Sequence, residues 1–200
     1  GSSSVAIAPD ELGKARTATL PTTAQLAGKL HFARSSSGPS GAVANGVLTY
    51  VPFAQDNMTY ATAPLNISKI PSDIPVGTAA NTSEVSLMNI YKGNITQVIT
   101  DSTTGDFIKL EAPSYVAGAG ETSNTIRAYV PQAGSGTRKD FLAKISLSET
   151  LVAAALASGC VKTGQEHDAS TLATNSIMPM SASRWIAMSN GASFKKQSAV

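Results

Sequence analysis

The chain has 200 residues, enough for one ordinary domain or two small lobes with a buried core. Apolar residues make up 42% of it and charged residues 14%, which is typical of a globular protein and excludes an intrinsically disordered one. The net charge is +2 and the basic residues are scattered, which gives no reason to expect a nucleic-acid or membrane partner. The single cysteine, Cys160, excludes an internal disulfide framework. The longest apolar run, 151–157, is too short to cross a bilayer.

The first part of the chain mixes helix-like and β-rich stretches. Residues 8–29 have helix-like stretches broken at Pro21. Three β-rich runs follow, at 30–34, 46–53 and 57–63. The next segment, 64–77, has three prolines and no helical period, which predicts a crossing between two lobes.

The second part alternates strands with helices. Ser83 is placed to cap a helix that Gly93 ends. The later elements are a strand at 126–130, a helix from about residue 138, a helix at 149–158, a strand at 177–180 and a helix at 183–188. This alternation predicts an α/β fold whose sheet has mainly parallel strands.

The loop between the strand at 126–130 and the following helix is the best candidate for a binding site. A helix start presents backbone N–H groups without intrahelical partners and a partial positive charge. Gly134 and Gly136 allow close approach to a ligand, Ser135 and Thr137 add hydroxyl donors, and Arg138 adds a positive charge. This combination predicts an oxyanion cradle, and the plain alternative is a turn followed by a helix cap.

The loop GSGTRKDF resembles the GSGT loop of phosphate-binding proteins of the type 2 periplasmic-binding superfamily. Other segments resemble that family, in the style of its actinobacterial members, and occur in the same order: LHFARSSSGPS, LTYVPFAQDNMTYAT, VSLMNIYKGNITQVI and IMPMSASRWIA. The similarity runs from about His31 to Ala187. It implies a two-lobed α/β fold, with 1–64 plus 175–200 forming an incomplete first lobe and 65–174 forming the second.

The function implied by the resemblance is non-catalytic solute binding outside the cell or at its surface. Phosphate or another oxyanion would be held in the cleft between the lobes, without a cofactor, and delivered to an ABC transporter permease or a surface sensor. The first lobe lacks the family's glycine-rich opening strand, so a partner segment is expected to fill its sheet. The predicted ligand-binding residues are Ser35, Ser36, Ser37, Ser135, Gly136, Thr137 and Arg138.

Three positions depart from the family pattern. Pro131 stands where family members have an arginine, Ala133 where they have an acidic residue, and Ser36 where they have an aspartate. Without a carboxylate to accept the proton of phosphate, the site is expected to discriminate poorly between phosphate and sulfate. The same losses support an alternative function, a structural or adhesive surface protein that keeps the fold without the ligand.

The sequence offers little for catalysis or metal binding. Cys160 and His167 lack a third partner and a glycine elbow, so a nucleophile–base pair is disfavoured. In the run of Glu166, His167 and Asp168, neighbouring side chains point apart, which favours a solvated loop over a metal site. Trp185 is expected to pack in the core rather than form a ligand platform.

Overall fold

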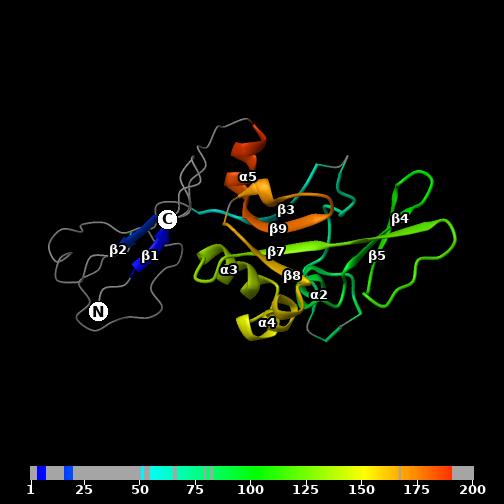
Figure 1. The fold of residues 1–200 in the computed structure, drawn as a ribbon, viewed down its shortest axis with the longest axis horizontal. Helices are drawn as coiled ribbons and strands as arrows, with labels where there is room; N and C mark the ends of the chain where they lie inside the picture. The colour runs from blue at the N-terminus through cyan, green and yellow to red at the C-terminus, as the bar shows by residue number, and fades with distance from the viewer. Residues whose placement is uncertain are drawn as a thin grey trace. The chain divides into compact units, whose positions relative to one another are not determined.

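The computed structural model describes Val51 and residues 55–64, 67–78, 80–81, 83–166 and 168–190, together with the backbone of strands at 4–7 and 16–19 (Figure 1). Two compact units are present, one formed by Gly1–Gln55 with Gly191–Val200 and the other by Asp56–Asn190. The predicted strand at 30–34, the ligand residues Ser35 to Ser37 and the proposed gap in the first lobe's sheet lie outside the described residues.

The described residues of the first unit form an antiparallel strand pair. Strand β1 (Ser4–Ile7) pairs with β2 (Arg16–Thr19), with Ser4 opposite Thr19 and Ile7 opposite Arg16. The helix-like interpretation of 8–29 is therefore wrong at 16–19. Two β-branched threonines in this short stretch favour the strand.

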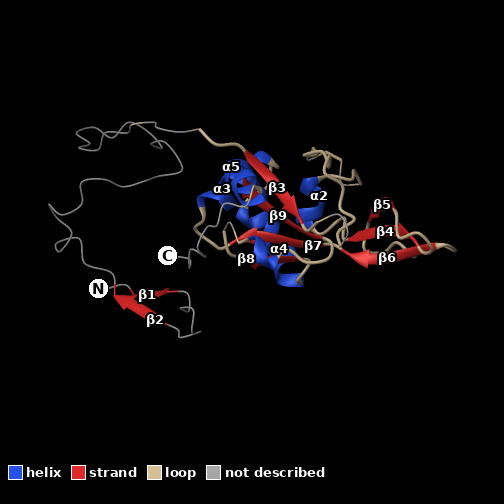
Figure 2. Cartoon of the chain, turned by 90° about the horizontal axis from the view of Figure 1, so that it is seen from above, coloured by secondary structure: helices blue, strands red, loops and turns tan. Residues whose placement is uncertain are grey.

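The second unit mixes strands and helices, which confirms the predicted α/β class (Figure 2). Its elements are β3 (Met58–Thr62), α2 (Leu87–Lys92), β4 (Gln97–Asp101), β5 (Phe107–Glu111), β6 (Glu121–Thr125), β7 (Arg127–Pro131), α3 (Gly136–Lys144), α4 (Glu149–Ser158), β8 (Val161–Gly164), the 3₁₀ helix η1 (Ala169–Thr171), β9 (Ser176–Ser181) and α5 (Ala182–Ser189).

The main sheet has four strands in the order β3-β9-β7-β8. The central strand β7 runs parallel to β8 and to β9, whereas β3 is antiparallel to β9. The chain thus leaves β7 toward one neighbour, β8, and returns on the other side of β7 as β9. The predicted lobe boundaries at 64/65 and 174/175 both lie within this unit, and the division into two lobes stays a prediction.

A second sheet forms a small arm, in the order β5-β4-β6, and all its pairings are antiparallel (Figure 2). The expectation of mainly parallel strands therefore holds for the main sheet and fails for the arm. Only the pairings of β7 with β8 and β9 are parallel among those described. The sequence of β6, ETSNT, has no apolar residue and so no alternation by which a strand is ordinarily found.

Helices cover both faces of the main sheet. On one face Ala128, Val130 and Ile177 join the large core, together with buried residues of α2, α3 and α4. On the other face Met178 and Met180 pack with half-buried Trp185 of α5, as expected for a core tryptophan. Successive residues of β9 thus point to opposite layers, as a strand buried on both faces requires.

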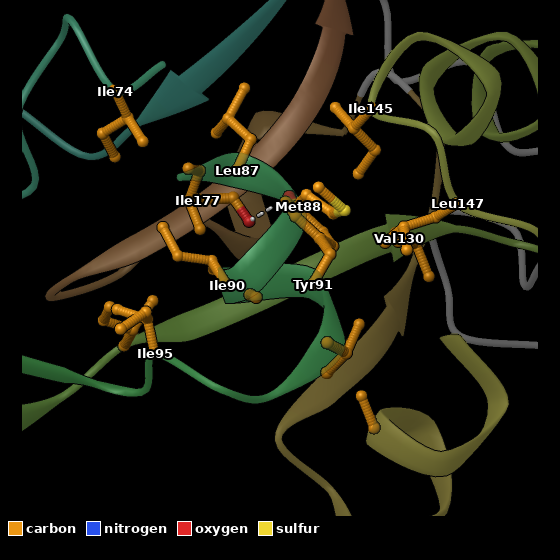
Figure 3. Close-up of a cluster of buried hydrophobic side chains, with 14 of the residues drawn as sticks. Ile74, Leu87, Met88, Ile90, Tyr91, Ile95, Val130, Ile145, Leu147 and Ile177 are labelled. Carbon is orange, nitrogen blue, oxygen red and sulfur yellow. Dashed lines mark hydrogen bonds between the residues drawn. The ribbon is translucent and has the colours of Figure 1, made fainter. Parts of the chain in front are cut away.

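Helix α2 is the centre of the large core (Figure 3). Gly93 ends it in the left-handed conformation, as predicted, but its cap is Ser86 and not Ser83. The Ser86 hydroxyl accepts from the Asn89 N–H at 3.3 Å. The first helical N–H, that of Leu87, is donated to the Pro75 carbonyl at 2.9 Å, so packing against the preceding extended segment fixes the later start.

Tyr91 of α2 ties two strands of the main sheet together. Its side chain is fully buried and meets the Phe141 ring edge-on at a centroid distance of 4.8 Å. Its hydroxyl lies 3.0 Å from the Tyr129 carbonyl of β7 and 3.3 Å from the Ile177 carbonyl of β9. Burial raises the pKa of Tyr91 well above its usual value, so the hydroxyl remains a donor.

Replacing Tyr91 with Phe keeps the ring and removes the hydroxyl. We expect this change to lower the free energy of unfolding by about 1–3 kcal/mol, because buried carbonyls lose their donor. Urea unfolding measures this loss, and the dependence of the free energy of unfolding on urea concentration should be the same in the parent and the variant. Tyr115→Phe, on the more exposed arm, serves as the control, and an equal loss in both variants would contradict the special role of Tyr91.

Candidate functional site

The carboxyl ends of β7 and β9 form a topological switch point. The chain leaves β7 for α3, which packs on one face of the sheet, and leaves β9 for α5, which packs on the other. Because the two strands are parallel neighbours, both helices begin at the same edge of the sheet. Open α/β sheets bind ligands at such a place.

The first turn of α3 is a capped helix start with two backbone donors that lack an acceptor. Gly134 adopts a left-handed conformation with φ of 85°, and the buried Ser135 caps the helix by accepting from the Arg138 N–H at 3.1 Å. The backbone N–H groups of Gly136 and Thr137 have no acceptor within the part of the chain that the structure describes. Both residues are half-buried, and they follow the carboxyl end of β7.

A carboxylate already lies at this helix start. The Thr137 hydroxyl donates to the Glu166 carboxylate, and the Glu166 N–H donates to Oε1 of Gln132 at 2.9 Å. The partial positive charge of the helix start favours such an anion. Sequence reasoning placed Glu166 in a solvated loop and missed this contact. The feature of the sequence that could have found this contact is the position of Glu166, which follows the carboxyl end of β8, the parallel neighbour of β7.

Arg138 has a structural contact that the sequence did not indicate. Its guanidinium is buried and donates to the carboxylate of Glu149, through Nε at 2.9 Å, and to the Pro131 carbonyl, through Nη1 at 3.1 Å. These bonds hold α3 against the start of α4 and the end of β7. The predicted contact of Arg138 with an anion stays a prediction, because it requires this ion pair to open.

The start of α5 also has its own carboxylate. Ser181 caps the helix by accepting from the Arg184 N–H at 3.1 Å and donates its hydroxyl to Asp56. Asp56 further accepts from the Ser183 N–H at 3.2 Å. The hydrogen bond from Ser181 is the main reason that the pKa of Asp56 is lowered. Neither Asp56 nor Ser181 was a sequence candidate.

The structure gives no support to a metal or nucleophile site among the described residues. No group of three potential metal ligands occurs there. Asp168 accepts from the Ser170 N–H at 2.9 Å and caps η1, and Cys160 packs against the edge of the large core. His167 and the serines at 35–37 lie outside the described residues.

Comparisons of the chain with protein-family models, with curated proteins and with solved structures find no match. The family resemblance therefore rests on the ordered motifs alone. Among the described residues no single helix is long and apolar enough to cross a membrane, and the one pair that passes this test together, α3 with α4, is bent by 103°.

Removing the Arg138 side chain tests its structural contact. We expect Arg138→Ala to lower the free energy of unfolding by about 1–3 kcal/mol, since the Pro131 carbonyl loses a donor and Glu149 loses its partner. The exposed neighbour Lys139→Ala is the matched control and should change stability by less than about 0.5 kcal/mol. Equal effects in chemical denaturation would show that the contacts of the buried Arg138 guanidinium contribute nothing specific.

The Asp56 contact makes a pH-dependent contribution to stability. Its pKa is lowered in the folded protein, so its stabilisation is present above the ordinary carboxyl value of about 4 and disappears as the pH falls through the lowered pKa. Asp56→Asn should therefore be less stable than the parent at neutral pH, and the two should converge in acid. Thermal unfolding across pH, with Asp106→Asn of the arm as control, measures this; a difference independent of pH would contradict it.

Proposed function

We propose that the protein is a non-catalytic solute-binding protein of the phosphate-binding type, acting outside the cell or at its surface. The observation that carries the proposal is the pair of backbone N–H donors of Gly136 and Thr137, at a helix start on the switch point of the sheet. A small oxyanion accepts several such donors at once and is favoured by the charge of the helix start.

The finer architecture belongs to the same proposal. Five family-like segments in order, and a β7–loop–α3 unit next to a parallel β8, support a type 2 periplasmic-binding fold with two lobes. The residues Ser35, Ser36 and Ser37 would belong to the same ligand site. A transporter permease or a surface sensor would receive the bound anion.

Glu166 changes the expected selectivity. The departures at Pro131, Ala133 and Ser36 predicted a site without a carboxylate and with poor discrimination. Glu166 places one on the hydroxyl of Thr137. A fully ionised sulfate beside this carboxylate meets only repulsion, whereas a hydrogen phosphate can donate its proton to it. The site is therefore proposed to favour phosphate over sulfate.

The alternative function is a structural or adhesive surface protein that no longer binds the anion. Two observations favour it: Arg138 is engaged by Glu149, and the Thr137 hydroxyl is engaged by Glu166. An internal carboxylate at the cradle competes with any external anion.

Calorimetric titration with phosphate and with sulfate separates the two functions. For solute binding, Thr137→Ala should weaken phosphate binding by about 1–3 kcal/mol, the range for a hydrogen bond to a charged group. Thr150→Ala is the matched control, because Thr150 is the second residue of α4 as Thr137 is of α3. Glu166→Gln should narrow the preference for phosphate over sulfate. Absence of binding to either anion would favour the adhesive alternative.

A further inference from the structure

Strand β6 is an edge of the arm, and the outward side of its backbone is open at Ser123 and Thr125, whereas the Glu121 N–H donates to the Gly118 carbonyl at 3.1 Å. Two hydrogen bonds that flank the strand show which residues of β6 bond to β4. The Ile126 N–H donates to the Thr96 carbonyl and the Ser102 N–H donates to the Gly120 carbonyl, both at 2.8 Å. In an antiparallel pair the residues that exchange such bonds alternate. Thr122 and Asn124 therefore face β4, and the N–H and C=O groups of Ser123 and Thr125 face outward.

Nothing in β6 blocks this open edge. Natural proteins protect edge strands with lysine, proline or a bulge. The opposite edge, β5, has a register shift against β4 and carries Lys109. In contrast, β6 pairs with β4 without a bulge, contains no proline or basic residue, and is exposed from Thr122 to Thr125.

We propose that a second copy of this chain pairs with β6, antiparallel and centred on Ser123. The outward groups lie at alternate residues, so the two Ser123 residues would face each other and exchange both backbone bonds. Glu121 would then stand opposite Thr125 of the second copy. The strand is thus complementary to itself, and no like charges are brought face to face.

Opposite charges on Glu121 and Arg127 support a second copy of this chain as the partner strand. Arg127 is exposed and has the same side-chain parity as Glu121, because only the buried Ile126 separates β6 from β7. In the proposed register, Arg127 of one copy is the diagonal neighbour of Glu121 of the other, whose carboxylate also accepts from the Tyr115 hydroxyl at 2.5 Å and from the Gly118 N–H at 2.9 Å. Long side chains reach a diagonal neighbour on the adjacent strand. Because the proposed dimer is two-fold symmetric, the pair of Arg127 and Glu121 would occur twice.

Two measurements on the full chain test the pairing. Sedimentation equilibrium should show a concentration-dependent dimer. Amide hydrogen exchange should show that Ser123 and Thr125 become protected as the dimer forms, whereas Thr122 and Asn124 are protected at every concentration by β4. A monomer throughout, or a dimer that leaves the Ser123 and Thr125 amides unprotected, would overturn the proposal.

Variants at Ser123 separate backbone pairing from other contacts. Ser123→Pro removes an N–H that points away from β4 and should weaken dimerisation roughly tenfold or more, since both central bonds are lost together. Ser123→Ala keeps the N–H and should dimerise as the parent does, and Arg127→Glu should weaken the dimer by creating a like-charge diagonal. Circular dichroism checks that Ser123→Pro is folded, and if it is not, the exchange data on the parent decide. Undiminished dimerisation of a folded Ser123→Pro variant would refute the pairing.

Discussion

The position of β7 between two parallel neighbours is the constraint on which the rest of the described unit depends. Strand β7 pairs with β9 only at the start of both strands, where Arg127 lies opposite Ser176 and Ala128 lies opposite Ile177. The Tyr91 hydroxyl lies against a carbonyl of each strand at this point. A single buried donor therefore joins α2 to the two strands whose ends define the switch point. The layers on both faces, and the two helix starts at the edge, follow from that junction.

Local chemistry explains which elements could be predicted from the sequence. Helix α4 runs from its Ser148 cap to Gly159, and α3 follows the strand–glycine–helix pattern, because both depend on residues adjacent in the chain. Strand β6 could not be found, since it is polar and exists only as the edge partner of β4. The Ser86 cap was missed for a similar reason, as tertiary contacts with the 75–76 segment decide where α2 begins.

The candidate site shows the same division between local and long-range information. The helix start at Ser135 to Thr137 was predicted, because a helix start is encoded by its own loop, and its contact with an anion stays a prediction. The carboxylate of Glu166 and the engagement of Arg138 by Glu149 were not, since each joins separate elements of the fold. Arg138, which adjoins the loop in sequence, is thus paired with Glu149, while the carboxylate that reaches the loop, Glu166, follows the neighbouring strand β8.

Both helix starts at the switch point are neutralised by carboxylates of the chain itself, Asp56 at α5 and Glu166 at α3. The two helix starts differ in which of their hydrogen-bond donors the carboxylate engages. At α5 the Asp56 carboxylate accepts both from the cap hydroxyl and from a backbone N–H of the first turn. At α3 the hydrogen bond to Glu166 comes from a side chain, and the N–H groups of Gly136 and Thr137 have no acceptor among the described residues.

That difference is the reason to propose the anion site at α3 rather than at α5. A ligand at α3 has to compete for one hydroxyl and finds two backbone donors available, whereas at α5 it would have to displace Asp56 from both kinds of donor. Strand β7, which ends at this cradle, continues backward through the buried Ile126 into β6 (Figure 2). The open backbone edge of the arm and the open donors of the helix thus stand at opposite ends of one extended segment.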